Sequence, residues 1–130
     1  MHWADGYVGL PFKEWGRDRT GIDCWGLARL VLAERCGLIL PRLDGTRDPL
    51  AVAAVEAPQF EDIDLKDAEE LDAVIMLEEV RVGLGWQLAP VHIGLVIAPR
   101  QVLHIRRGGL SCIEPLSRQR VCGAKRRPRP

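Results

Sequence analysis

The sequence has no apolar run of the roughly 20 residues that a membrane-spanning helix needs. Its first residues also lack the cationic start and the apolar run that together mark a signal peptide. We therefore expect no membrane insertion, and a protein that is made and kept in the cytoplasm unless something larger carries it out. The 130 residues correspond to one ordinary domain, and a hydrophobic content of 47% is enough to bury a core.

No pair of cysteines has the C-x-x-C spacing of a zinc knuckle, so we expect no structural metal site among the four. A cytoplasmic chain of this size needs no disulfides either. Cys36 and Cys112 lie in apolar runs and are most simply small core residues. Cys122 lies in a basic segment, which leaves Cys24 as the cysteine to consider for chemistry.

The formal net charge is zero, but the charges are unevenly distributed along the chain. Acidic residues dominate positions 56–79, and every charged residue in positions 118–130 is basic. Such a basic segment can meet phosphates or anionic wall polymers, or it can simply be solvated. We predict a folded domain over residues 1–117, followed by a basic and partly frayed C-terminal tail over residues 118–130.

Residues 24–36 carry apolar side chains at roughly helical spacing. Asp23 is a good N-cap in front of this segment, and Gly37 suits the position just after the last turn. We predict a helix there, and a second helix over residues 48–57, where an aspartate cap is followed by a proline. The acidic stretch 61–70 reads as a linker or a short helix.

Short β-rich segments, each bounded by turn residues, follow the acidic stretch. They cover residues 73–77, 93–97, 101–106 and 111–116. Plausible turns at 98–100 and 108–109 would join antiparallel neighbours. Helices first and a meander of strands after them predict an α+β fold, with N-terminal helices packed on an antiparallel β-sheet.

Cys24 falls in the first turn of the predicted helix. The helix dipole and the free N–H groups of that turn favour the thiolate, which is the attacking form of a cysteine nucleophile. Gly26 close to it would leave room for a substrate backbone. A lone cysteine at the start of an amphipathic helix can equally be a packing residue, so this position alone does not decide for an enzyme.

Two histidines, His92 and His104, lie in neighbouring predicted strands. An even number of residues separates them, so a hairpin without a bulge would place both on the same face of the sheet. One imidazole could then take the thiol proton of Cys24 while the other orients the first. The alternative is two half-buried strand histidines whose nitrogens are hydrogen-bonded for structural reasons.

Several motifs resemble the NlpC family of bacterial cell-wall endopeptidases. Residues 21–27, Gly-Ile-Asp-Cys-Trp-Gly-Leu, resemble the nucleophile motif, and residues 11–16 resemble the Pro-aromatic segment before it. His92-Ile93-Gly94 resembles the His-Val-Gly strand that supplies the base, and residues 72–77 resemble the Gly-Asp-hydrophobic strand. His104 falls where the family has its third polar residue. The motifs follow one another in the family's order and spacing.

The resemblance implies a papain-like fold and a cysteine peptidase domain over residues 1–117. It implies hydrolysis of an amide bond in the peptidoglycan stem peptide, typically after the D-glutamyl residue and before the diamino acid. Cys24 would attack the carbonyl, His92 would carry the proton, and His104 would hold His92 in its working tautomer. The resemblance implies no metal, cofactor or nucleic acid. It is strongest to the NlpC-type domains of phage tail assembly and tail-tip proteins, so other tail proteins are expected partners and the virion tail an expected destination.

Two positions depart from the family pattern. Phe12 stands where the family has a catalytic-site tyrosine, although Tyr7 is close in sequence. Trp25 stands where many cell-wall members have a serine that helps to hold the free amine of the stem peptide. We expect Phe12, Asp23 and Trp25 to contact the substrate, with Asp23 able to pair with an amine. Trp25 could instead point away and pack under residues 3–15.

Two other functions stay open at this stage. The domain could be a structural or binding module of a phage tail with little activity, as the substitutions at Phe12 and Trp25 would allow. It could also carry out acyl transfer or amidase chemistry on the same scaffold.

Overall fold

The computed structural model describes residues 2–42 and 60–128 of the chain, so the helix predicted over 48–57 lies outside the described residues. The first half contains a 3₁₀ helix, a short hairpin and the one α-helix of the described residues. These elements are η1 (Trp3–Tyr7), β1 (Arg17–Asp18), β2 (Gly21–Ile22) and α1 (Cys24–Cys36). No helix in the described part of the chain is long and apolar enough to cross a membrane.

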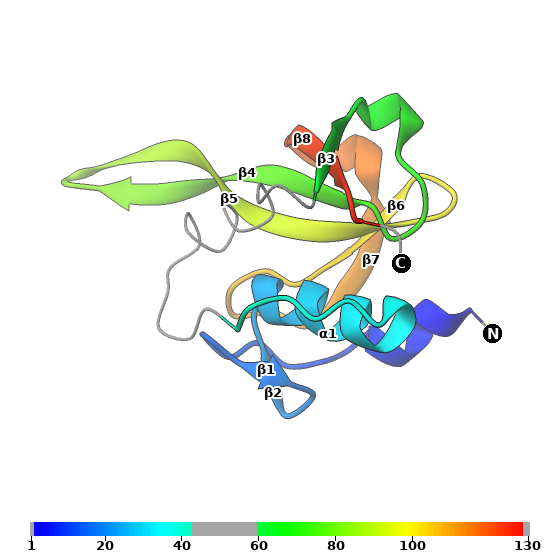
Figure 1. Cartoon of the computed structure of the whole chain (residues 1–130). Helices are drawn as coiled ribbons and strands as arrows, with labels where there is room; N and C mark the ends of the chain where they lie inside the picture. Colours follow the sequence, from blue (N-terminus) through cyan, green and yellow to red (C-terminus); the bar gives the residue numbers. More distant parts are fainter. Residues whose placement is uncertain (1, 43–59, 129–130) are drawn as a thin grey trace.

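The second half forms a six-stranded antiparallel sheet in the order β3-β8-β4-β5-β6-β7. Its strands are β3 (Glu61–Ile63), β4 (Ala73–Val82), β5 (Gly85–Ile97), β6 (Gln101–His104), β7 (Cys112–Pro115) and β8 (Val121–Arg126). Two short 3₁₀ helices, η2 (Leu65–Asp67) and η3 (Leu116–Arg118), lie between strands. The predicted α+β class is confirmed: a helix packs against an antiparallel sheet (Figure 1).

Helix α1 begins and ends where the sequence predicts. The Asp23 side chain accepts a hydrogen bond from the Gly26 N–H at 2.8 Å, which satisfies one of the orphan donors of the first turn. Gly37 ends the helix in the left-handed conformation, with φ 67°, where a glycine has no Cβ clash. The helix therefore starts one residue after its cap, at Cys24.

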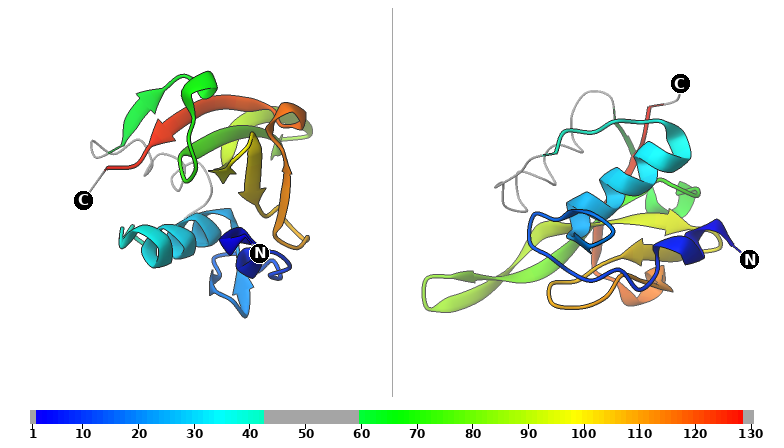
Figure 2. Two further views of the ribbon diagram at one scale, coloured as in Figure 1. Left: turned by 90° about the vertical axis from the view of Figure 1, so that its right-hand side faces the viewer. Right: turned by 90° about the horizontal axis from the view of Figure 1, so that it is seen from below.

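The sheet buries apolar side chains on both of its faces. One cluster lies between α1 and the sheet and includes Leu27, Val31, Ile93 and Leu103. A smaller cluster on the other face gathers side chains of β4, β5, β6 and β8 with those of β3 and η2. Figure 2 shows the helix and the N-terminal segment on one side of the curved sheet. The first cluster therefore fixes α1, which begins at Cys24, against the sheet.

Strands β4 and β5 are longer than predicted, because they continue as a hairpin that projects from the body (Figure 1). A register shift after Met76 separates the part of β4 that packs in the core from the projecting part. Leu84 and Trp86, in the projecting part, are 98% and 64% exposed. Residues 79–82 and 86–88 do alternate between apolar and polar, so a strand signal was present in the sequence and was overlooked.

The prediction of a basic tail from residue 118 is wrong for residues 121–126, which form β8 between β3 and β4. The basic side chains of β8 are paired with the acidic stretch. Lys125 forms an ion pair with Asp62, and Arg126 Nη2 lies 3.0 Å from Asp72 Oδ2. Pairing with opposite charge lets a polar segment join the sheet, and its backbone hydrogen bonds do not need apolar side chains.

Candidate active site

Cys24 is the first residue of α1 and is 7% exposed. The Asp23 carboxylate fixes the chain in front of it through hydrogen bonds from three groups. These donors are the Gly26 N–H, the Trp15 N–H at 3.0 Å and Arg17 Nη1 at 2.7 Å. These bonds fix the backbone at the helix start, and the positive end of the helix dipole lies at Cys24.

Gly26 serves packing and not substrate access, which corrects the sequence-based expectation. A Cβ on Gly26 would lie 2.1 Å from the backbone oxygen of Gly16, so no side chain fits there without moving the main chain. The missing side chain lets the loop before β1 press against the first turn of α1. This contact is in the first turn of α1, the turn that begins with Cys24.

His92 and His104 meet as the parity of the strands predicts. His92 lies on β5 and His104 on β6, and His92 Nε2 is 2.8 Å from His104 Nδ1. Both imidazoles are buried, with exposures of 3% and 0%. His104 Nε2 lies 2.5 Å from Glu114 Oε1 on β7. The structure therefore brings together a chain of three side chains from three adjacent strands.

Gly94 makes this chain possible. It lies two residues after His92 on the same face of β5, where a side chain would stand between the histidines and their neighbours. A Cβ on Gly94 would lie 2.5 Å from Val102 Cγ2, 2.9 Å from Met76 Cε and 3.2 Å from His104 Cβ. The space that a side chain would take is thus filled by its neighbours, and His104 can reach across to His92.

The carboxylate at the end of the chain determines which nitrogens carry protons. Arg106 Nη1 lies 2.6 Å from Glu114 Oε1, and the hydrogen bonds from Arg106 and His104 lower the pKa of Glu114. An ionised carboxylate only accepts, so His104 Nε2 donates to it and the neutral His104 accepts at Nδ1. His92 Nε2 must then be the donor between the histidines. The lone pair of the neutral His92 is left on Nδ1, the nitrogen that a general base needs.

Burial keeps both histidines neutral. Desolvation is the main cause that lowers the pKa of His92 to about 3, and the neighbouring His104 lowers it further. Burial also lowers the pKa of His104. Glu78 Oε1 lies 3.6 Å from His92 Nδ1, where it can stabilise the imidazolium that forms when His92 takes a proton.

Cys24 and His92 line the same small pocket, of about 30 Å³. Its other walls are Phe12, Glu14, Trp15, Asp23, Glu78, Ile105 and Arg107. A second, larger cavity of about 470 Å³ shares His92 and Glu78 with it and is lined further by residues of β4, Arg106 and residues 118–120. The candidate nucleophile Cys24 and the candidate base His92 thus line one pocket, and His92 also borders the larger cavity.

The three residues predicted to contact substrate have different surroundings. Phe12 lines the small pocket, with the Arg107 guanidinium over its ring at 5.7 Å. Asp23 also lines the pocket, with its carboxylate oxygens engaged in the contacts that fix the helix start. Trp25 is 1% exposed, and its Nε1 donates to the Pro41 carbonyl at 2.8 Å, so its predicted role in substrate contact is wrong. Its position one residue along the helix turns it about 100° away from Cys24.

Tyr7 does not take the place of the tyrosine that Phe12 replaces. Its hydroxyl donates to Glu34 Oε1 at 2.6 Å, and the Arg19 guanidinium lies 5.1 Å from its ring centroid. Neither described cavity includes it. Tyr7 ties the N-terminal segment to α1.

Sequence reasoning missed Glu78, Arg106 and Glu114. The parity rule that paired the histidines also applies to Glu114, which lies an even number of residues after His104, on the next strand. The even spacing was therefore visible in the sequence, but its use requires the pairing register of β6 and β7, which the sequence does not show. Glu78 follows the register shift in β4, which local patterns do not reveal.

Neither a protein-family model nor a curated protein matches the sequence. Solved structures do match. The NlpC/p60 domain of the peptidoglycan hydrolase SagA superposes with a TM-score of 0.66 at 20% identity, over 93% of this chain and 90% of that one. An NlpC/P60 family protein from Bacillus cereus ATCC 10987 gives a TM-score of 0.69 at 19% identity, over 95% of this chain and 37% of its own length.

A protein similar to a lipoprotein of the NLP/P60 family, from Staphylococcus aureus subsp. aureus Mu50, gives a TM-score of 0.68 at 20% identity. The match covers 98% of this chain and 39% of that protein. The present chain therefore corresponds to one domain of the two longer proteins and to most of the SagA domain. Likeness at this level of identity establishes architecture, so the chain has the papain-like α+β fold of NlpC/p60 domains.

Proposed function

We propose that this protein is a cysteine peptidase that hydrolyses an amide bond in peptidoglycan stem peptides. The observation that carries the proposal is the oriented chain Glu114–His104–His92, which ends in a lone pair on His92 Nδ1 beside the pocket that Cys24 lines. Two histidines with a purely structural role would not need to be buried and neutral, with their hydrogen bonds oriented toward a cysteine at the start of a helix. The NlpC/p60 fold supports the same reading.

The reaction uses the thiol, the imidazole and one water molecule. Cys24 Sγ attacks the amide carbonyl while its proton passes to His92 Nδ1. The first N–H groups of a helix have no partner within the helix, so the Cys24 N–H is suited to hold the oxyanion. The intermediate collapses to a thioester as His92 returns the proton to the leaving amine. Water, deprotonated by His92, then hydrolyses the thioester and releases the carboxylate and the free thiol.

The charges around the groove fit a substrate with both signs. Glu14 and Arg107 line the small pocket, Arg106 lines the larger cavity, and Glu78 lines both. Stem peptides carry free carboxylates together with the amine of the diamino acid. We propose the bond between D-glutamate and the diamino acid as the one cleaved, because the γ-linked carbonyl then has a charged group on each side.

The phage tail remains our proposal for the setting in which the enzyme works. It is supported by the likeness of the Asp-Cys-Trp-Gly motif at residues 23–26 to tail-associated domains. With Trp25 buried, no side chain at that position either holds or excludes a free stem-peptide amine. The side chains that line the groove would therefore determine whether the enzyme accepts stem peptides still attached to glycan.

Digestion of purified peptidoglycan, read by mass spectrometry of the released peptides, tests the function. The native chain should release fragments cut after D-glutamate, and Cys24→Ala should release none while it keeps the native melting temperature. Wall-degrading activity in Cys24→Ala would overturn the proposal. Products cut at another amide would keep the enzyme class and reject the bond.

A catalytically weak tail module is the second candidate, favoured by Phe12 in place of a polar side chain at the pocket. Alkylation by iodoacetamide separates the two. Burial raises the pKa of the Cys112 and Cys122 thiols, which slows their alkylation. An enzyme requires Cys24 to react much faster than either, and a module with an idle site does not.

A further inference from the structure

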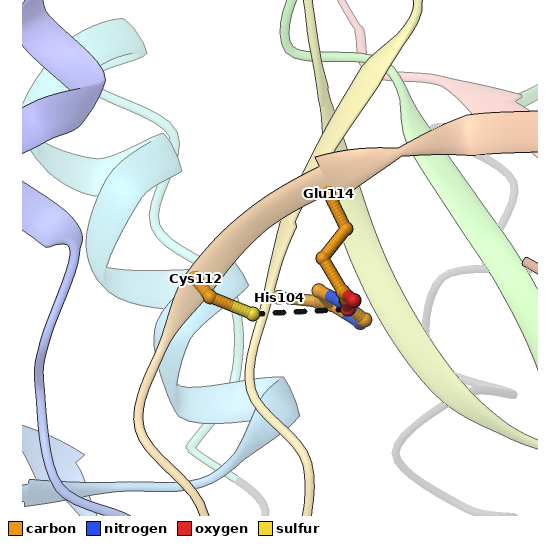
Figure 3. Close-up of side chains that lie close together, drawn as sticks. All are labelled: His104, Cys112 and Glu114. Atoms are coloured by element: carbon orange, nitrogen blue, oxygen red, sulfur yellow. Dashed lines mark hydrogen bonds and ion pairs between the residues drawn. The ribbon is translucent and has the colours of Figure 1, made fainter. Parts of the chain in front are cut away.

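A second group of polar side chains lies at the outer end of the histidine chain. His104, Cys112 and Glu114 place a ring nitrogen, a sulfur and a carboxylate oxygen within 4.8 Å of one another (Figure 3). Cys112 Sγ lies 3.8 Å from Glu114 Oε1, the oxygen that is 2.5 Å from His104 Nε2. Figure 3 shows the side chains of Cys112 and Glu114 extending from β7 toward His104 on β6.

The strands hold these three side chains on one face. His104 and Cys112 are directly opposite in the antiparallel register of β6 and β7, and Glu114 follows Cys112 by two residues. Residues opposite each other and residues two apart on a strand share a face of the sheet. Sites built on paired strands are held more precisely than sites on loops. The group is therefore positioned before any ligand arrives.

The donor set selects a class of metal ion. Nitrogen, sulfur and carboxylate oxygen together suit Zn²⁺ and Co²⁺, whereas Mg²⁺ and Ca²⁺ prefer oxygen alone. Three protein ligands leave a fourth tetrahedral position for water. The sequence shows no zinc motif because these ligands are brought together by strand pairing and not by C-x-x-C spacing.

We propose that His104, Cys112 and Glu114 bind a divalent cation of the Zn²⁺ class, and that this binding switches off the catalytic histidine by reversing the hydrogen bond between His104 and His92. The binding part of the proposal stands on the three side chains alone. The effect on catalysis rests on the proposed function.

Binding requires small local movements. The cation replaces the proton on His104 Nε2, and both this proton and that of the Cys112 thiol are released to solvent as the two groups become ligands. Ligands at about 2.1 Å in a tetrahedral site lie about 3.4 Å apart, so Glu114 must retreat from its present hydrogen bond. Its side chain is 34% exposed and can rotate. Arg106 is paired with the same carboxylate and must move outward, which its 49% exposed side chain allows. The loss of this ion pair weakens binding of the metal ion, as expected for a reversible site.

The switch follows from the two nitrogens of one imidazole. In the metal-free protein, His104 Nε2 carries the proton and Nδ1 accepts from His92. Once Nε2 is a metal ligand, the proton of a neutral His104 must be on Nδ1, which then donates to His92 Nε2. His104 Nδ1 receives this proton from His92 Nε2, and His92 takes up a proton from solvent at Nδ1 in its place. The nitrogen that should take the Cys24 proton no longer has a lone pair.

Cobalt titration of Cys24→Ala tests the binding without catalysis. This variant removes Cys24, the one cysteine among the residues that line the small pocket with His92, so a thiolate-to-cobalt charge-transfer band reports on Cys112. We expect one equivalent of Co²⁺ to give the band. Adding Cys112→Ser should weaken binding by about 100-fold or more, since even an outer-sphere change commonly costs 10- to 100-fold. Adding Cys122→Ser, at an exposed cysteine, should change nothing.

The absence of the band in Cys24→Ala, or its persistence with both Cys112→Ser and Cys112→Ala, overturns the proposed site. The effect on activity is tested in chains that keep Cys24. Zn²⁺ should inhibit the native and Cys122→Ser proteins, a chelator should restore both, and Cys112→Ser should need about 100-fold more Zn²⁺. Equal inhibition of Cys112→Ser would place the metal on Cys24 and reject the switch. If the metal-free native protein does not cut peptidoglycan, the proposed function fails while the cobalt result still decides the site.

Discussion

Replacing Glu114 by alanine tests whether this carboxylate directs the protons of both histidines. Glu114 Oε1 accepts from His104 Nε2 at 2.5 Å, and a hydrogen bond to a charged group contributes about 1.5–3 kcal/mol. This contribution favours the arrangement with a lone pair on His92 Nδ1 over the reverse arrangement. Since about 1.4 kcal/mol is a factor of ten, losing it should lower the reactive population roughly 10- to 100-fold. Partial exposure of Glu114 places the expected loss in the lower half of that range.

The assay is kcat for a purified muropeptide at pH 7, compared between the native chain, Glu114→Ala and Glu114→Gln. The glutamine keeps an acceptor oxygen without the charge, so its kcat should fall between the other two. Glu114 lines neither described cavity, and KM should therefore change little. Alkylation of Cys24 should slow in parallel with kcat. A native kcat in Glu114→Ala, with its fold intact, would refute the argument that the carboxylate sets the tautomers.

Gly94→Ala should lower the free energy of unfolding by about 1–3 kcal/mol and remove most of the activity. The reason is that its Cβ would meet Val102 Cγ2 at 2.5 Å and push His104 away from His92. An active variant with the native Tm would show that the strands accommodate the methyl group. Stability in urea should fall as the pH drops from 6.5 toward 3. The pKa of His92 is about 6.5 in the unfolded chain and about 3 in the folded protein, so the unfolded state binds more protons between pH 3 and pH 6.5. The free energy of unfolding should therefore fall by up to about 1.4 kcal/mol for each pH unit in this range. If His92→Asn shows the same pH dependence as the native chain, this explanation is contradicted. Arg126→Ala should lower Tm more than Arg118→Ala, because it leaves buried Asp72 without its ion pair; equal values would mean that the ion pair adds no stability.

The helix and the histidine pair were predictable because their signals are local. Asp23 and Gly37 mark the two ends of α1 through backbone geometry that depends on neighbouring residues alone. His92 and His104 lie on consecutive strands joined by a short turn, so parity is enough to put them on one face. In both cases the deciding contacts lie close in sequence.

What the sequence hid depends on contacts between distant segments. β3 pairs with β8 across more than 60 residues, through ion pairs such as Lys125 with Asp62, and each segment taken alone looks like solvated charge. Trp25 illustrates the same limit on a smaller scale. A helical pattern shows that a residue is helical, but the direction in which its ring points is decided by what packs there, here the carbonyl of Pro41.

The strand order also has a consequence for how the chain assembles as it is synthesised. Strands β4 to β7 are neighbours both in sequence and in the sheet, so each can pair with the one before it as soon as it emerges from the ribosome. Among the described strands, β3 forms its ladder hydrogen bonds with β8 alone, so it cannot pair into the sheet before residues 121–126 are made. The histidine chain therefore belongs to the part that assembles early, and β3 closes the sheet only after almost all of the described chain has been made.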